Sequence, residues 1–522
     1  MSKQIVDGCT AATYVAYALS EVATIYPITP VASMGEIADK WNVAGRLNVF
    51  GAPMQVREME SELGAAGATH GALVAGALAT TFTASQGLML MLPNMFKIYG
   101  ELLPAVFHVG CRTVASHALS IFGDHQDVMS CRTTGFTMLA SSSVQETHDL
   151  AVVAHLAAIA GSLPVLHFFD GWRTSNEIST IDMLPYDSIA SLVDRDAVAR
   201  FRSRAMNPDR PDLRGSAQNP DVFFQNREAA NRYYDAFPAI VQQYMDRLAA
   251  LTGRQYHLFD YVGDPEATEL IVAIGSSCDV IEETIGYLRA QGRRVGLIKV
   301  RLFRPFSEKD LVAAIPASVK SIAVIDRTKE PGAAGEPLYL DVAAALRRAG
   351  RNDIRLIGGR YGLASKDFDP SMVKAIYDEL LKENPKDGFT VGITDDVTYR
   401  SLDVTDHIVT CPDNLRQAVF YGMGSDGTVG ATKQAAAIIG SEPGLYAQAY
   451  FHYSAKKSGG YTISELRIGD APIRSAYGIE NADYVACNKN TYVTRFDLTK
   501  RLRPGGTFVL NSPWTAADME RE

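Results

Sequence analysis

Two carboxylates in the stretch from Arg57 to Gly76, REMESELGAAGATHGALVAG, are spaced for proton chemistry. If the whole stretch is one helix, Glu58 and Glu62 lie four residues apart on one side of it. The opposite side is a stripe of small residues, Gly64, Gly67, Gly71 and Ala75. Each glycine inside a helix costs about 0.8–1 kcal/mol relative to alanine, and close approach of a second backbone is the usual reason. We therefore expect a buried helix whose poorly solvated carboxylates suit acid–base catalysis. The alternative is a solvated polar face on which Glu58 pairs with Arg57.

A glycine-rich turn in RQAVFYGMGSDGTVGATKQAAAIIG is a second candidate. Gly422, Gly424 and Gly427 form a GxGxxG pattern between an expected strand and an expected helix, which would let the backbone approach a phosphate at the helix amino terminus. No acidic residue ends the next strand, LYAQAYFHY, so a nicotinamide site is not expected. Lys456 and Lys457 follow in AKKSGG, either as a ligand-binding pair or as a solvated basic turn.

The composition excludes several classes of protein. With 522 residues the chain is too long for one hydrophobic core, and about three domains are expected. A net charge of −9 without a basic run argues against nucleic-acid binding. No secretory signal and no apolar span of about 20 residues is seen, which predicts a cytoplasmic protein. The six cysteines are scattered without a CxxC pair, so local spacing builds neither a zinc site nor an iron–sulfur cluster, no metal ligands are assigned, and buried reduced thiols are expected.

The region up to about Gly253 alternates helices with short strands. Helices are expected over 10–21 and 143–160, and strands in VATIYP, PAVFHVG and PVLHFF. This alternation predicts a parallel sheet covered on both faces, in which ligands bind beyond the carboxyl ends of the strands. Thr29, Arg112 and the pair Asp170-Gly171 each follow one of these strands. All of them are therefore placed where a ligand would bind.

The rest of the chain predicts an arm and two further α/β regions. Residues 207–232 are expected to be a long loop or arm that docks onto another subunit or covers a site. The strands LIVAIGSS, VGLIKV and SIAVIDR indicate a second α/β region, to which we assign no chemistry. The third region stops after GTFVLNSPW without the crossover that another parallel strand needs, so it looks unfinished. The predicted domains are 1–254, 255–410 and 411–522, all α/β with mainly parallel, doubly wound sheets.

The order of several motifs resembles the amino-terminal part of pyruvate:ferredoxin (flavodoxin) oxidoreductase. The series is YPITP, REMESELGAAGATHGAL, FTASQG, HVGCRTVASHALSIFGDHQD, FFDGWRTS, RGSAQNPD, LFDYVG, IKVRLFRPF, DRTKEPG, GRYGL, DGTVGA, KKSGG and FVLNSPW. Any one string is weak, but the ordered series covers nearly the whole chain. The resemblance implies a domain that binds the pyrimidine of thiamine diphosphate, a transketolase C-terminal-like domain and the start of a domain associated with coenzyme A.

The resemblance also implies a reaction and the residues that serve it. The family decarboxylates pyruvate with coenzyme A to acetyl-CoA and CO2, and passes electrons to ferredoxin or flavodoxin. Glu62 matches the glutamate that hydrogen-bonds the thiamine ring nitrogen, whereas its neighbours Glu58 and Glu60 do not fit the motif. Arg112 and the hydroxyl of Thr29 match the pair that holds the substrate carboxylate. The resemblance also places coenzyme A contacts at Gly424, Gly427, Lys456 and Lys457.

The same resemblance implies partners and leaves alternatives open. The family is dimeric, and its Mg2+ and [4Fe-4S] clusters are expected only in a carboxyl-terminal part whose motifs this sequence lacks. The chain is thus expected to be a truncated sequence or one subunit of a split enzyme, and to be inactive alone. Two alternatives remain: a related oxidoreductase acting on 2-oxoglutarate or on a branched or aromatic oxoacid, and a non-catalytic remnant that keeps the fold.

Overall fold

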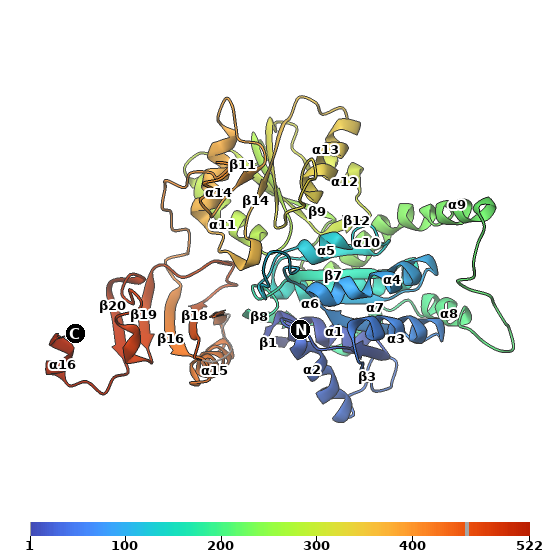
Figure 1. The fold of residues 1–522 in the computed structure, drawn as a ribbon, viewed down its shortest axis with the longest axis horizontal. Helices are drawn as coiled ribbons and strands as arrows, with labels where there is room; N and C mark the ends of the chain where they lie inside the picture. The colour runs from blue at the N-terminus through green and yellow to red at the C-terminus, as the bar shows by residue number, and fades with distance from the viewer. Residues whose placement is uncertain (1, 455–458, 522) are drawn as a thin grey trace. The chain divides into compact units, whose positions relative to one another are not determined.

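A computed structural model describes residues 2–454 and 459–521 as two compact units (Figure 1). Unit 1 consists mainly of Gly8–Ser175 and Met183–Thr410, and unit 2 combines Lys3–Asp7, Asn176–Asp182 and Cys411–Glu522. Unit 2 is therefore built from three separate stretches of chain. The predicted single stretch 411–522 did not include the first two of them.

The first sheet of unit 1 has seven strands in the order β12-β6-β7-β5-β4-β2-β3. All are parallel except β12, which pairs antiparallel with β6. The strands are β2 Val22–Ile25, β3 Gln55–Glu58, β4 Ala79–Thr83, β5 Val106–Cys111, β6 Thr137–Ser141, β7 Val165–Asp170 and β12 Leu302–Arg304. Strands β4 to β7 are buried along their whole length, because a parallel sheet covered by helices is apolar on both faces.

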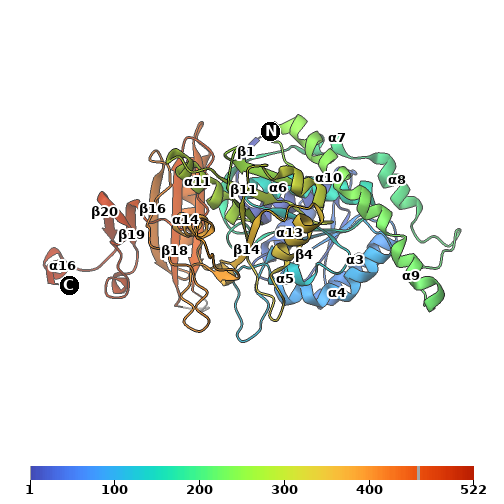
Figure 2. The same ribbon diagram turned by 90° about the horizontal axis from the view of Figure 1, so that it is seen from above.

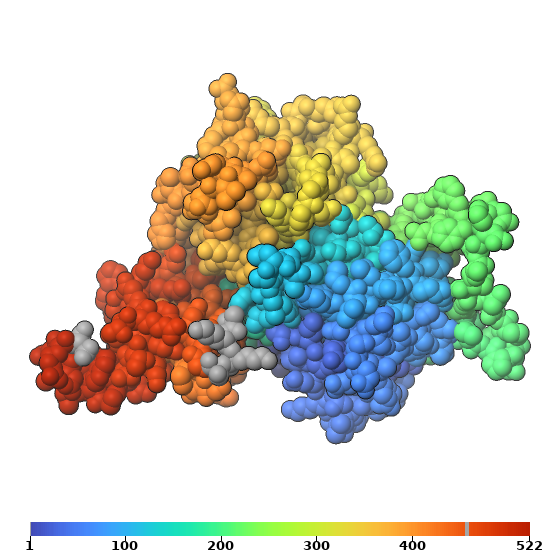
Figure 3. Space-filling model, in the orientation of Figure 1, coloured from blue at the N-terminus to red at the C-terminus, as the bar shows by residue number. Residues whose placement is uncertain are grey.

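The helices around this sheet are α1 Gly8–Leu19, α2 Ala32–Val43, α3 Glu62–Val74, α4 Ser85–Gly100, α5 Gln126–Ser130, α6 Val144–Gly161, α7 Tyr186–Leu192, α8 Arg195–Ser203, α9 Pro220–Glu228 and α10 Asn231–Thr252. The sequence located α6 correctly, and Ser143 caps it by accepting a hydrogen bond from Glu146 N. The expected arm contains α9, which has no buried residue and stands away from the rest of unit 1 in Figures 2 and 3.

The prediction of one helix from Arg57 to Gly76 was wrong. Residues 55–58 form the edge strand β3, and the helix begins only at Glu62, so Glu58 and Glu62 do not share a helix face. Val56 is the buried residue of a strand too short to show an alternating pattern. Among the described residues the expected close approach of a second backbone is not found at these glycines: a Cβ on Gly64 or Gly67 would meet only side-chain atoms, at 3.7 Å or more, and one on Gly71 would meet nothing within 4 Å.

A second sheet of unit 1 has the order β15-β14-β13-β10-β11-β9, parallel except for β9. Its strands are β9 Phe259–Gly263, β10 Glu269–Ala273, β11 Val295–Val300, β13 Ser321–Asp326, β14 Arg355–Arg360 and β15 Phe389–Thr390. Its helices are α11 Ser277–Ala290, α12 Glu308–Ala314, α13 Pro337–Arg348 and α14 Pro370–Leu380. This is the expected second α/β region, and its chain also supplies β12 to the first sheet.

Unit 2 contains a mixed sheet in the order β1-β8-β17-β18-β16-β19-β20. The central pairs β17/β18 and β16/β18 are antiparallel, while β16/β19 and β19/β20 are parallel, so this unit departs from the mainly parallel arrangement of unit 1. Its elements are β1 Ser2–Asp7, β8 Ile178–Met183, β16 Arg416–Met423, β17 Tyr446–Tyr453, β18 Tyr461–Gly469, β19 Ala482–Cys487, β20 Leu502–Leu510, α15 Thr428–Gly440 and α16 Ala516–Arg521.

Three buried histidines form a hydrogen-bonded chain in the core of the first sheet. His108 lies 2.9 Å from His167 (Nδ1 to Nδ1) and 3.0 Å from His155 (Nε2 to Nε2). This series of hydrogen bonds ends at Ser141, whose Oγ is 2.8 Å from His167 Nε2. Burial lowers the pKa of His108 to about 3, and burial together with His108 lowers the pKa values of the other two. The three rings are therefore neutral at physiological pH.

No helix among the described residues is sufficiently long and apolar for a membrane span. All six cysteines are free, and five of them are buried, as expected for thiols without a role in cross-linking.

Candidate functional site

Four segments with polar residues leave the same edge of the first sheet. In the sheet order β5-β4-β2-β3 the strands are parallel, so their carboxyl ends lie at one edge. Thr29 follows β2, Glu62 follows β3, Ser85 follows β4 and Arg112 follows β5. Because ligands of open α/β sheets bind at this edge, the three predicted site residues are placed where they could act together.

Glu62 is the first residue of α3 and is held there by its neighbour. Ser61 is the N-cap, and its Oγ accepts a hydrogen bond of 3.2 Å from Gly64 N. The side of the helix that carries Glu62 is buried, with 8% of the residue exposed. No hydrogen bond or ion pair reaches its carboxylate from the residues that the structure describes. A nearly buried acceptor without a partner in the chain is suited to a ligand donor.

Gly87 in α4 makes room for the Glu62 carboxylate. A Cβ at position 87 would lie 2.8 Å from Glu62 Oε1, 2.8 Å from Glu62 Cγ and 2.8 Å from Thr83 Oγ1. A Cβ at these distances would force the side chain of Glu62 or Thr83 to shift, so only glycine leaves both side chains where they are. The Thr83 hydroxyl is fully buried and has no hydrogen-bond partner in the described part of the chain. Two polar groups without partners therefore lie next to one glycine. The sequence did not single out Thr83 or Gly87, although both belong to the FTASQG motif.

Arg112 holds its guanidinium against the turn that contains Thr29. Its Nη1 donates a 3.0 Å hydrogen bond to the Thr29 carbonyl oxygen, and its Nε lies 3.5 Å from the Ser120 carbonyl. The contact involves the backbone of Thr29, whereas the predicted hydroxyl belongs to an exposed side chain. Burial lowers the pKa of Arg112, but a guanidinium remains charged. Nη2 has no partner among the described residues, so it is available to an anion such as a carboxylate.

Asp127 connects the two parts of this edge. It is fully buried in α5, and its Oδ2 accepts hydrogen bonds from Ser85 N at 2.8 Å and Arg112 N at 2.9 Å. Its Oδ1 accepts a third bond from Val128 N at 2.8 Å. Burial raises the pKa of Asp127 to about 7, although the three N–H groups act in the opposite direction. The sequence placed Asp127 in a motif without assigning it a role.

Asp170, at the end of β7, belongs to a separate cluster that joins the two sheets of unit 1. It accepts from His125 Nε2 at 2.5 Å, Arg327 Nη1 at 2.8 Å and Ser276 N at 2.9 Å. Burial alone would raise the pKa of Asp170, but Arg327 and His125 lower it well below its usual range. Both of its carboxylate oxygens are therefore bonded within the protein. Asp170 lies at the carboxyl end of β7, as the sequence predicted, but its side chain contacts other residues of the protein and has a structural role.

The glycine turn before α15 has the backbone that a phosphate site requires, but the carboxylate of Asp426 already binds N–H groups there. Gly427 is the N-cap of α15 with φ +94°, and Gly424 N donates to Gly460 O at 2.8 Å. The Asp426 carboxylate accepts from Thr428 N at 2.8 Å and Met423 N at 2.7 Å. Although partial burial opposes ionisation, these N–H groups lower the pKa of Asp426. A phosphate at this helix start would meet an ionised carboxylate, so the assignment of Gly424 and Gly427 stays a prediction.

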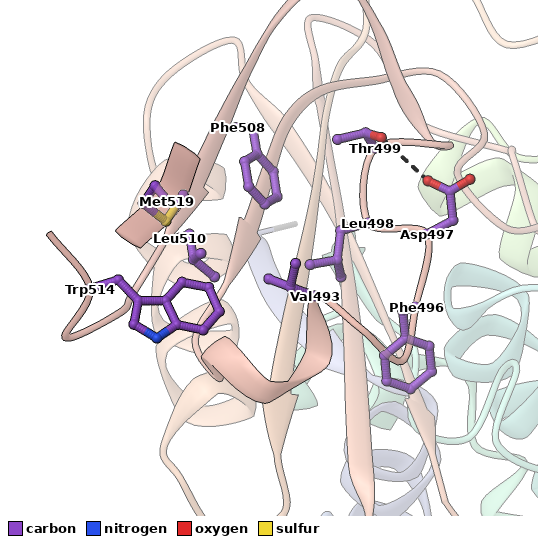
Figure 4. A pocket seen from close by; sticks show the side chains of 9 residues that line it. All are labelled: Val493, Phe496, Asp497, Leu498, Thr499, Phe508, Leu510, Trp514 and Met519. Atoms are coloured by element: carbon purple, nitrogen blue, oxygen red, sulfur yellow. Dashed lines mark hydrogen bonds between the residues drawn. The ribbon is translucent and has the colours of Figure 1, made fainter. Parts of the chain in front are cut away.

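The predicted lysine pair, Lys456 and Lys457, lies outside the described residues. The same unit contains an apolar cavity of about 250 Å³ (Figure 4). It is lined mainly by side chains of β20, α16 and the segments that flank β20, including Phe496, Phe508, Leu510, Trp514 and Met519. Asp497 is the ionisable residue of the lining, and its Oδ1 accepts hydrogen bonds from Thr499 Oγ1 at 3.3 Å and from Lys500 N at 3.1 Å. The cavity therefore shows no set of groups that could carry out a reaction.

Comparison with known proteins identifies first the kind of domain and then the family. Residues 14–246 match the family model described as "Pyruvate flavodoxin/ferredoxin oxidoreductase, thiamine diP-bdg". Residues 267–373 match "Pyruvate:ferredoxin oxidoreductase core domain II", and residues 417–521 match "Pyruvate ferredoxin/flavodoxin oxidoreductase". The first sheet and its polar edge thus belong to a thiamine diphosphate-binding domain.

Curated relatives agree with these matches over nearly the whole chain. The chain is 60% identical to the pyruvate:ferredoxin oxidoreductase of Moorella thermoacetica over 100% of its own length. It is 55% identical to the pyruvate-flavodoxin oxidoreductase of Enterobacter agglomerans over 99% of its length. The chain belongs to the pyruvate:ferredoxin/flavodoxin oxidoreductase family. It spans 44% of the length of each of these two relatives.

A solved structure supports the fold. The 2-oxoglutarate:ferredoxin oxidoreductase of Magnetococcus marinus, solved with 2-oxoglutarate, coenzyme A and succinyl-CoA bound, superposes with a TM-score of 0.54 at 18% identity. The match covers 73% of this chain and 65% of that one. At this identity the likeness shows the fold alone.

Proposed function

We propose that this chain is the part of a pyruvate:ferredoxin or flavodoxin oxidoreductase that holds the pyrimidine end of thiamine diphosphate and the carboxylate of pyruvate. The observation that supports this most is the Glu62 carboxylate, which is nearly buried, lies beside Gly87 and has no partner in the described chain. Glu62 and Arg112 follow strands β3 and β5, whose carboxyl ends lie at the same edge of the first sheet. The 55–60% identity to enzymes named for pyruvate favours pyruvate over other oxoacids.

The residues present fit the thiamine cofactor. When bound, thiamine diphosphate supplies the nucleophilic carbon and the electron sink that decarboxylation of a 2-oxoacid requires. Glu62, in the first turn of α3, would accept a hydrogen bond from a protonated ring nitrogen of the pyrimidine and hold the proton there. The Thr83 hydroxyl, orphaned in the described chain, offers a second polar contact within the same space.

Arg112 and Thr29 orient the substrate. The free Nη2 of Arg112 donates to the pyruvate carboxylate, and the exposed Thr29 hydroxyl adds a second donor. The guanidinium is held by two backbone carbonyls, so little of its freedom is lost when the carboxylate binds.

The complete reaction needs groups beyond these residues. Pyruvate and coenzyme A give acetyl-CoA, CO2, a proton and two electrons, which pass to ferredoxin or flavodoxin. We assign the Mg2+ ion and the [4Fe-4S] clusters to the part of the relatives that this chain does not span, and expect a homodimer in the cytoplasm. The coenzyme A contacts remain proposed at Gly424, Gly427, Lys456 and Lys457. We also propose a boundary near residue 254 between the thiamine domain and the second α/β domain.

The substitution Glu62→Gln tests this function. It should be made in the complete enzyme, meaning this chain together with the polypeptide that supplies the remaining length of its relatives. Glutamine keeps the size of the side chain but cannot hold the proton, so we expect pyruvate-dependent reduction of ferredoxin to fall by about 1,000-fold or more, with thiamine diphosphate still bound.

Glu60→Gln is the matched control, because Glu60 is exposed and lies two residues before Glu62. It should leave turnover unchanged. Near-normal activity of Glu62→Gln would remove Glu62 from the mechanism. If the unsubstituted complete enzyme acts on 2-oxoglutarate but not on pyruvate, the assignment of pyruvate as the substrate is refuted. Absence of turnover in the unsubstituted complete enzyme would favour the non-catalytic alternative.

A further inference from the structure

A single buried carboxylate oxygen joins the two segments that carry the opposite halves of the site. Asp127 Oδ2 accepts from Ser85 N at 2.8 Å and from Arg112 N at 2.9 Å. Ser85 begins α4, and Gly87, two residues later, borders Glu62. Arg112 follows β5 and carries the guanidinium that contacts the Thr29 turn. The Asp127 side chain therefore links the start of α4, where Gly87 borders Glu62, to the segment that carries Arg112.

The backbone around this oxygen depends on it. Ser85 has φ +54°, an unusual conformation for a residue with a side chain, at the point where β4 turns into α4. Arg112 is the first residue after β5, whose pairing with β7 ends at Cys111, so its N–H lies just beyond the end of the ladder. Both N–H groups are buried, and neither can turn to water without moving its segment. Removal of the acceptor would leave two unsatisfied donors at the two places where the site is built.

We propose that Asp127 is a positioning residue that fixes the Arg112 backbone and the start of α4 relative to each other, and so sets both substrate-carboxylate binding and thiamine binding. The inference rests on the proposed function, since it assigns Glu62 and Arg112 their ligands. Asp127 itself touches no ligand, and its effect passes through the two backbone amides.

The test substitution is Asp127→Asn, which keeps the shape but replaces one of the two acceptor oxygens with an NH2 donor, so the amides of Ser85, Arg112 and Val128 cannot all stay bonded. In the complete enzyme we expect the KM for pyruvate to rise by about tenfold and the Kd for thiamine diphosphate by about threefold or more, because both segments shift. Arg112→Leu serves as a comparison and should raise the KM for pyruvate without affecting the Kd for thiamine diphosphate.

Asp326→Asn is the matched control. Asp326 is a buried carboxylate at the end of β13 that also accepts from two backbone amides, Leu338 N at 3.0 Å and Tyr339 N at 3.2 Å, and burial likewise raises its pKa to about 7. Its loss should lower the melting temperature to a similar extent while KM and Kd stay unchanged. A purely structural role for Asp127 would give the same pattern in both variants and would overturn the proposal.

Amide hydrogen exchange on the 522-residue chain gives a readout that does not depend on turnover. Asp127→Ala, which removes both acceptor oxygens, should speed exchange at the amides of Ser85 and Arg112 by about tenfold, and Asp326→Ala should not. Unchanged exchange at both amides would refute the positioning role even in an active enzyme. If the unsubstituted complete enzyme does not use pyruvate, the proposed function fails, and exchange still decides the link between the two segments.

A second variant covers the case in which Asp127→Asn does not fold. Asp127→Ser is smaller and leaves space for a water molecule that could bond both amides. It should fold and show an intermediate rise in KM. Failure of both variants to fold, with Asp326→Asn folded, would show that Asp127 serves the fold as a whole and would count against a specific role in the site.

Discussion

Gly87 determines how much room the Glu62 carboxylate has. A methyl group at position 87 would lie 2.8 Å from both Cγ and Oε1 of Glu62, so Gly87→Ala must push the carboxylate out of its position. A displacement of about 1 Å at a catalytic group costs about 100-fold in rate, and we expect a fall in kcat of that order. Steady-state kinetics of the complete enzyme would measure it.

Gly286→Ala is the control for this substitution. Gly286 also lies inside a helix, α11, but a Cβ there would meet nothing within 4 Å. It should leave kcat unchanged and stabilise the helix slightly, because alanine is the better helix former. Equal kcat values for Gly87→Ala and the unsubstituted enzyme would show that the Glu62 carboxylate does not need this position.

The individual site residues were predictable to different extents. Glu62, Thr29 and Arg112 came from the motif series, and the structure brings them to one sheet edge, although their roles stay predictions. Asp127 and Gly87 could not be assigned in the same way. Their importance depends on a hydrogen bond and a contact between residues at least 15 positions apart, and no local spacing reports such a contact.

At the scale of the elements, α3 depends on its cap. Ser61 Oγ accepts from Gly64 N, so Ser61→Ala should lower the free energy of unfolding by about 0.5–2 kcal/mol, measured by urea titration. The same substitution should lower turnover, because the cap fixes the first turn, where Glu62 lies.

Ser143→Ala separates these two effects. Ser143 caps α6 with the same geometry, accepting from Glu146 N at 3.2 Å. It should cost a similar amount of stability and leave turnover unchanged, since α6 carries no proposed site residue. A loss of turnover in Ser143→Ala equal to that in Ser61→Ala would mean that global stability, not the position of Glu62, controls activity.

Element prediction failed where the decisive contacts are distant in sequence. The strand β3 has only four residues and was merged into the following helix, because a pattern with a period of 3.6 residues continues by chance across so short a segment. Strands β1 and β8 pair into a sheet made mostly of residues after 411, and nothing in their own sequences indicates that partner. Long helices with a clear cap, such as α6, were predicted well.

At the scale of the whole molecule, the buried histidines make stability depend on pH. The pKa values of these histidines are lowered in the folded state. Below about pH 6.5, the usual pKa of a histidine, the unfolded chain therefore binds more protons than the folded chain. Their contribution to stability is complete above that pH and is lost as the pH falls toward the folded values, by up to about 1.4 kcal/mol per pH unit for each ring.

His155→Gln tests this dependence. The variant removes one titrating ring, so between pH 6.5 and 5 its urea midpoint should fall less steeply than that of the unsubstituted chain. The difference between the two is the quantity to measure, because burial raises the pKa of Asp127 and Asp326 to about 7 and these carboxyls act in the opposite direction. His117→Gln, at an exposed position, should change nothing. Identical slopes for all three proteins would contradict the assignment.

Strand β12 has a consequence for anyone who wishes to divide this polypeptide. Residues 302–304 come from the second α/β region, yet they cover the outer edge of β6 in the first sheet. A fragment that ends near residue 254 would therefore expose the edge of β6. An exposed strand edge pairs readily with other extended chains, so the fragment should aggregate. Soluble expression of the thiamine-binding module should require either the second region in trans or a short synthetic peptide that takes the place of Leu302–Arg304.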